Sequence, residues 1–103
     1  MPRELHYTDD ALADLDAIGG WLTQPGSGPR ARRRLTAIWT AIERLIDHPC
    51  LYAIGAHDGV RELPCHGGYR ALYVVHPDTG RSRTAGDVRV LRVFGPGQSR
   101  DRI

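Results

Sequence analysis

The fold of this 103-residue chain is constrained most by a change of pattern at Pro49. Before that proline, apolar residues recur at the spacing of an α-helix, which places them along one side of it. After it, short runs rich in valine and tyrosine alternate with glycines, a pattern typical of strands and tight turns. The chain is long enough for one domain with one modest core. The sequence therefore predicts helices first and a sheet afterwards.

Two helices are predicted in the first half. Thr8 supplies an N-cap hydroxyl and two aspartates follow it, so the first helix should run from Asp9 to Leu22, after an extended stretch from Glu4 to Tyr7. The segment from Thr23 to Pro29 contains too many prolines and glycines for anything but a connector. A second helix should then run from Arg30 to His48. The apolar stripes are Ala11, Leu15, Ile18 and Leu22 in the first helix, and Leu35, Ile38, Trp39, Ile42, Leu45 and Ile46 in the second.

Three strands are predicted in the second half, at Val60–Pro64, Tyr69–His76 and Val88–Phe94. The middle one carries apolar residues on both faces, which marks a central strand. Consecutive strands joined by short connections should pair antiparallel. The predicted fold class is α+β, with the order β-α-α-β-β-β and a helical hairpin packed on a small, mainly antiparallel sheet. Residues 1–103 should form a single domain in which 95–103 is an irregular tail.

The formal net charge is only +2, but all 14 basic residues are arginine. GC-rich coding is the simplest explanation for the absence of lysine, although arginine can also bind carboxylates and phosphates through two hydrogen bonds at once. Four arginines stand together at the start of the second predicted helix, where cations meet the positive end of the helix dipole. These are Arg30, Arg32, Arg33 and Arg34. The cluster invites an anionic partner, unless it is a solvated face partly paired with the aspartates of the first helix.

Arg61 and Arg70 lie on strands that a tight glycine turn connects. In such a hairpin the two arginines are expected to lie close together and to concentrate positive charge on the sheet. The alternative is that Arg61 pairs with Glu62 or with a helix aspartate and protects an exposed sheet edge.

The cysteines and histidines match no known metal-binding spacing. Cys50 and Cys65 form no CxxC pair, and neither a secretory signal nor a membrane-spanning apolar run is visible. We therefore expect a reduced, cytoplasmic protein without membrane contact. The histidines considered as metal ligands beside Cys65 are His48, His57, His66 and His76. Their spacing fits no zinc site, so no metal and no cofactor are predicted.

The order of these segments resembles the RelE/ParE superfamily of bacterial type II toxins. The similarity covers nearly the whole chain and is carried by TDDALADLDAI, LIDHP, GVREL, GYRALYVV and VRVLRVF. The resemblance implies a toxin that a cognate antitoxin holds in check, through a flexible segment that folds across it. It also implies a hetero-oligomer with that antitoxin.

Members of the superfamily divide into two activities. RelE-like members cleave messenger RNA on the ribosome, which requires cations for the phosphorane and an acid–base pair. Arg61 and Arg70 match basic positions of that set, and His66 is the available acid–base group, whereas the tail GPGQSRDRI offers neither tyrosine nor histidine. ParE-like members bind and poison DNA gyrase and need only a contact surface. The chain resembles ParE-like members more closely.

Three functions therefore stand as hypotheses. The first is a non-enzymatic gyrase inhibitor, the second a ribosome-dependent mRNA endoribonuclease using Arg61, Arg70 and His66, and the third a non-toxic antitoxin-binding module. The residues expected to contact the target are Arg61, Arg70, Arg92 and Arg100. Those expected to contact the antitoxin are Arg30, Arg33, Arg34 and Trp39.

Overall fold

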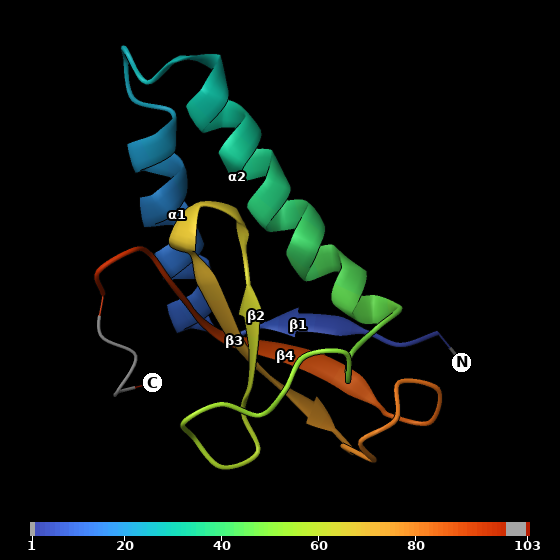
Figure 1. Cartoon of the computed structure of the whole chain (residues 1–103). Coiled ribbons are helices and arrows are strands. Elements are labelled where there is room, and N and C mark those ends of the chain that lie inside the picture. The colour runs from blue at the N-terminus through green and yellow to red at the C-terminus, as the bar shows by residue number, and fades with distance from the viewer. Residues whose placement is uncertain (1, 99–102) are drawn as a thin grey trace.

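A hairpin of two helices packs against a four-stranded sheet (Figure 1). The computed structural model describes residues 2–98 and 103. The elements are β1 (Leu5–Tyr7), α1 (Asp9–Leu22), α2 (Gly28–Glu43), the 3₁₀ helix η1 (Arg44–Ile46), β2 (Arg61–Pro64), the 3₁₀ turn η2 (His66–Gly68), β3 (Arg70–His76) and β4 (Asp87–Phe94). Within these residues no helix is long and apolar enough to cross a membrane. The predicted α+β class and element order are confirmed.

The strand order in the sheet is β1-β4-β3-β2. β2, β3 and β4 form consecutive antiparallel pairs, as predicted, and β3 is an inner strand. β1 joins the far edge by pairing parallel with β4, with Leu5 opposite Val88. The sheet therefore brings the first and last strands of the chain side by side, which places the start of α1 next to the middle of β4.

The first helix has the predicted bounds, because Thr8 caps it: its Oγ1 accepts a hydrogen bond from the Ala11 amide at 3.0 Å. The second helix differs from the prediction at both ends. It begins at Gly28, since Pro29 occupies the first turn, where a missing N–H costs nothing. It ends as an α-helix at Glu43 and tightens into η1 instead of continuing to His48.

The main core lies between the helices and one face of the sheet. The fully buried side chains there include Ile38 and Ile42 of α2 and Tyr73 of β3. A second, smaller cluster lies on the opposite face, where Leu72 and Phe94 pack with Val60 from the loop before β2. Both faces of β3 are thus covered, which explains why its sequence is apolar on both sides.

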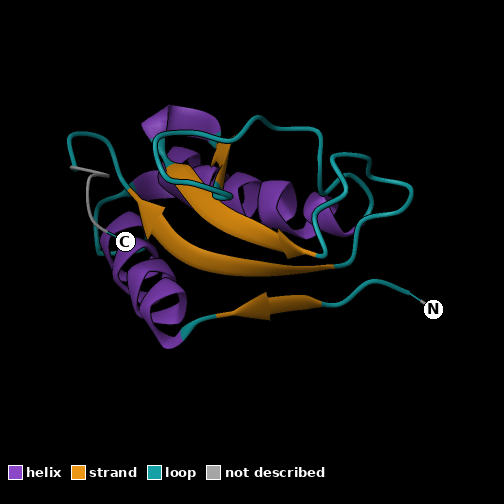
Figure 2. Cartoon of the chain, turned by 90° about the horizontal axis from the view of Figure 1, so that it is seen from below, coloured by secondary structure: helices purple, strands orange, loops and turns teal. Residues whose placement is uncertain are grey.

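A β-bulge in β4 shifts its register with β3 between Leu72 and Tyr73. Tyr73 lies opposite Val90 and Leu72 opposite Arg92, which leaves Leu91 as an extra residue. β1 is shorter than β4, so the end of β4 has no neighbouring strand on that side. Side chains of Thr8 and α1 bond to its backbone instead. The Thr8 hydroxyl donates to the Leu91 carbonyl at 2.8 Å, and Asp14 accepts the Val93 amide at 2.9 Å. Figure 2 shows α1 alongside this end of β4.

Gly20 of α1 offers a stability test of the helix. A Cβ at this position would meet nothing within 4 Å, so Gly20→Ala should raise the free energy of unfolding by about 0.5–1 kcal/mol through helix propensity. Gly26 is the matched control: it has equally open space but a φ of +88°, so Gly26→Ala should destabilise. Urea denaturation measures both. A destabilised Gly20→Ala variant would contradict the exposure of this helix face.

Candidate functional site

Arg61 and Arg70 point to opposite faces of the sheet, which corrects the expectation that they lie close together. Arg61 pairs with Tyr73, and Arg70 pairs with Pro64. Arg61 and Pro64 are an odd number of residues apart on one strand, and side chains alternate between faces along a strand. Arg61 therefore shares the helix-covered face with Tyr73, while Arg70 is on the outward face.

The buried side chain of Arg61 is held in an ion pair with a residue of the loop after β3. Its Nε and Nη2 donate to the two carboxylate oxygens of Asp78 at 2.9 and 3.0 Å, and Nη1 donates to the Tyr52 carbonyl at 2.6 Å. The hydrogen bonds from Arg61 hold the pKa of the Asp78 carboxyl below its usual value, and the carboxylate raises the pKa of Arg61. The partner is thus a loop aspartate, and neither Glu62 nor a helix aspartate. This arrangement gives Arg61 a structural part, while its contact with a target stays a prediction.

The face of β3 and β4 away from the helices carries a group that we call the Arg70 patch: Arg70, Leu72, Arg92 and Phe94. Leu72 and Phe94 are buried there in the smaller cluster, so Arg70 and Arg92 are the members that reach solvent. Arg70 lies opposite Phe94 and Leu72 opposite Arg92, and residues opposite one another share a face. The Arg92 guanidinium carbon stands 4.9 Å from the centre of the Phe94 ring. The structure thus brings together two of the arginines predicted to contact the target. Arg100 lies outside the described residues.

Asp14 of α1 fixes Arg92 within the Arg70 patch. The Nε and Nη2 of Arg92 donate to the two carboxylate oxygens of Asp14 at 2.7 and 3.0 Å. Together with the bond from Val93, the carboxylate accepts three N–H groups. Arg92 is therefore held in one orientation over Phe94, whereas Arg70 is half-buried beside it.

His66 lies in η2, the turn between β2 and β3, and its side chain is exposed. Gly67 and Gly68 follow at φ values of +79° and +84°, which only glycine adopts easily. The neighbouring thiol of Cys65 is buried, and burial raises its pKa to about 11, so it stays protonated near neutral pH. Neither group is set beside Arg61, because Arg61 is the first residue of β2 and both groups follow the end of that strand.

The arginines predicted to contact a partner separate in the structure. Arg30 and Arg33 are exposed on α2, whereas Arg34 is half-buried. Trp39 packs on Tyr7 of β1, with ring centres 5.9 Å apart, and so belongs to the margin of the core. The alternative, in which arginines of α2 pair with aspartates of α1, is not seen in the ion pairs of the described residues, where Asp14 of α1 pairs with Arg92 of β4.

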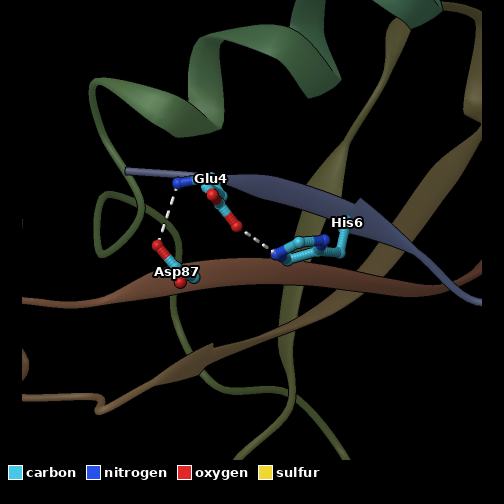
Figure 3. A group of neighbouring side chains, drawn as sticks. All are labelled: Glu4, His6 and Asp87. Carbon is cyan, nitrogen blue, oxygen red and sulfur yellow. Dashed lines mark hydrogen bonds and ion pairs between the residues drawn. The ribbon is translucent and has the colours of Figure 1, made fainter. Parts of the chain in front are cut away.

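Glu4, His6 and Asp87 form a group where β1 pairs with the start of β4 (Figure 3). One potential ligand atom of each lies within 4.8 Å of the others. The candidate ligands predicted from the sequence do not include His6. All three side chains are exposed, and their contacts within the protein account for the grouping: His6 pairs with Glu4 at 3.0 Å, and Asp87 accepts the Glu4 amide at 2.9 Å. The absence of a bound metal stays a prediction.

Comparison with known proteins gives two matches. Residues 5–97 match the family described as "ParE toxin of type II toxin-antitoxin system, parDE". The fold is similar to a solved structure titled "Chromosomal ParDE TA system from P. aeruginosa", with a TM-score of 0.69 and 21% identity over 92% of this chain and 97% of that one. No curated protein matches the sequence significantly.

Proposed function

Because the chain belongs to the ParE toxin family of type II toxin–antitoxin systems, we propose that it inhibits DNA gyrase by binding to it and that a cognate antitoxin neutralises it. The toxin acts on a cytoplasmic target and forms a hetero-oligomer with its antitoxin when it is neutralised. It binds its target without cleaving RNA. The family match extends over nearly the whole domain, from β1 to the turn after β4, so it covers every element that shapes the surfaces described above.

One observation supports a binding surface over a catalytic site: the three candidate ribonuclease residues are not set around a common point. Arg61 faces the helices and is held by Asp78, Arg70 faces outward, and His66 is exposed in a turn. In-line cleavage of RNA needs a cation and proton-transfer groups around one phosphate. A binding toxin needs only a rigid contact surface.

We place the gyrase contact on the Arg70 patch. Arg92 is rigidly held by Asp14 and stacks on Phe94, while Arg70 lies beside them on the same outward face. A rigid guanidinium over an aromatic ring loses little side-chain entropy on binding, which suits an interface hot spot. Arg100, which lies outside the described residues, remains a proposed target contact. Arg30, Arg33 and Trp39 remain proposed antitoxin contacts on α2.

The proposal is tested with purified toxin and gyrase. The toxin should block supercoiling or promote gyrase-dependent DNA breaks, and Arg70→Ala should weaken inhibition about tenfold or more, as expected for a lost charged contact. Arg81→Ala, at an exposed position in the loop after β3, is the matched control and should inhibit like the wild type. Failure of saturating wild-type toxin in both assays would exclude gyrase as the target.

Two further measurements separate the other hypotheses. Primer extension on translated messages would show cleavage within codons if the toxin were a ribonuclease, and that cleavage would disappear in Arg70→Ala. Normal growth after induced expression would instead indicate a non-toxic antitoxin-binding module. The proposal predicts growth arrest without codon-specific cleavage.

A further inference from the structure

A hollow of about 540 Å³ lies between α1, the start of α2 and the segment after β4. It is lined by Ala17, Ile18 and Trp21 of α1, by Arg34 of α2, by Tyr69, and by Gly95, Pro96 and Gln98. We call it the Arg34 hollow. Trp21, at its rim, is 66% exposed and is the most exposed large apolar side chain of the described residues. An exposed tryptophan beside a hollow is typical of a protein-binding surface.

Among the residues that the structure describes, Arg34 is the only charged side chain in the lining. Its Nε is buried and has no hydrogen-bond partner among the described residues. Most buried polar groups in native proteins are hydrogen-bonded, so an unpaired one calls for an explanation. None of the ion pairs described above includes Arg34, although the neighbouring helix α1 carries four aspartates.

The turn η2 holds Arg34 in place. A Cβ at Gly67 would lie 2.6 Å from the Arg34 Nε and 2.8 Å from its Cδ, so the glycine backbone packs directly on the side chain. Gly67 also has a φ of +79°. The stem and the Nε of Arg34 are therefore confined between α2 and η2, and the side chain lines the hollow. A fixed guanidinium is preorganised for a carboxylate, which it binds through two parallel hydrogen bonds.

We propose that the Arg34 hollow receives an acidic side chain of the cognate antitoxin, with an apolar neighbour of that residue packed on Trp21. The assignment rests on the proposed neutralisation by an antitoxin. Charge complementarity supports it, since a carboxylate would pair with Arg34, the one charged side chain that the described residues contribute to the lining. The apolar lining from α1 also suits a segment that folds on binding, because such a segment must bury apolar surface to offset its loss of entropy.

The hollow and the Arg70 patch are separate surfaces. Arg34 and Tyr69 lie on the helix side of the sheet, where Tyr69 belongs to the main core, whereas Arg70 faces outward. Changes at Arg34 should therefore affect antitoxin binding and leave gyrase inhibition unchanged. This separation allows the two functions to be tested independently in one protein.

The experiment measures the affinity of full-length toxin for the antitoxin encoded beside it. The affinity is measured by isothermal titration calorimetry, which leaves the rest of the sequence unchanged, including Trp21 and Trp39. Arg34→Met keeps the apolar stem and removes the charge, and it should weaken binding about 10- to 100-fold, the loss expected for a charged hydrogen-bonded pair. Arg32→Met, at an exposed position of the same helix that is not among the proposed antitoxin contacts, is the matched control and should change the affinity less than twofold.

A charge swap identifies the partner group. Arg34→Glu should abolish tight binding of the antitoxin. Replacing the acidic antitoxin residue that pairs with Arg34 by arginine should then raise the affinity for Arg34→Glu at least tenfold. Arg34→Met should unfold no more easily than the wild type, because its Nε has no partner to lose. If the wild type and Arg34→Met bind the antitoxin with equal affinity, the role assigned to Arg34 is wrong, while the proposed neutralisation by an antitoxin still stands. A wild-type toxin that does not bind this antitoxin at all would overturn the proposed neutralisation as well.

Discussion

Replacing Tyr73 by alanine is expected to lower the free energy of unfolding by about 4 kcal/mol, in the range observed when a buried aromatic side chain is truncated. Tyr73 is completely buried in the middle of β3, between Arg61 of β2 and Val90 of β4. Its hydroxyl donates to the Pro49 carbonyl at 2.7 Å, which ties the sheet to the end of the helical half. Small domains have only about 5–15 kcal/mol of stability, so the variant should be barely folded in urea titrations.

Tyr73→Phe is the control that separates packing from hydrogen bonding. It keeps the ring but leaves the Pro49 carbonyl without its donor, so we expect a loss of about 1–2 kcal/mol. Burial raises the pKa of the Tyr73 hydroxyl, which therefore stays a neutral donor at all ordinary pH values. If alanine and phenylalanine cost the same, the hydrogen bond and not the packed ring would be the main contribution of this residue.

Removing the Asp78 carboxylate is expected to destabilise the protein by about 2–3 kcal/mol at pH 7. Asp78→Ala leaves the Arg61 guanidinium, whose side chain is only 9% exposed, without its counter-charge. Breaking a fully buried pair in this way costs about 3–5 kcal/mol, and the lower figure applies because 23% of the Asp78 side chain reaches solvent. Asp58→Ala, at an exposed position of the loop before β2, is the control and should change stability by less than about 0.5 kcal/mol.

The same pair makes this loss depend on pH. The pKa of Asp78 is lowered in the folded protein from the ordinary value of 3.8, mainly by the hydrogen bonds from Arg61. A carboxyl group with a depressed folded pKa stabilises the protein above its unfolded pKa, and the contribution disappears as the pH falls through the folded value. The difference in unfolding free energy between the wild type and Asp78→Ala should therefore be constant from pH 5 to 7 and shrink below about pH 4. A difference that persists at acidic pH would mean that the loss comes from packing.

The elements that form through local interactions were predictable from the sequence. The first helix starts and ends where the pattern placed it, because its cap is made within one turn, between Thr8 and Ala11. The fold class, strand order along the chain and inner position of β3 followed from the same kind of local pattern. The second helix was displaced because Pro29 was counted as a breaker, although a proline in the first turn is compatible with a helix.

The candidate site was predicted less well than the fold. The sequence picked out Arg70 and Arg92, and the register of β3 and β4 brings both to one face. The sequence prediction placed Arg61 and Arg70 close together. The register of β2 and β3 puts them on opposite faces, because side chains alternate along each strand. Nothing in the local pattern pointed to Asp78 or Asp14 as partners, because each pairs with an arginine on a different element.

Sequence alone thus determined which segments form helices and strands, and it indicated the family, since hydrophobic period, caps and turn residues act over a few positions. Tertiary structure alone decided which arginines are available. It buried Arg61 against a loop carboxylate and fixed Arg92 on α1. It left the Arg34 Nε without a hydrogen-bond partner among the described residues, in a hollow built from distant parts of the chain. The physical reason is that charge pairing depends on distances of a few ångströms between side chains far apart in sequence, and only packing sets those distances.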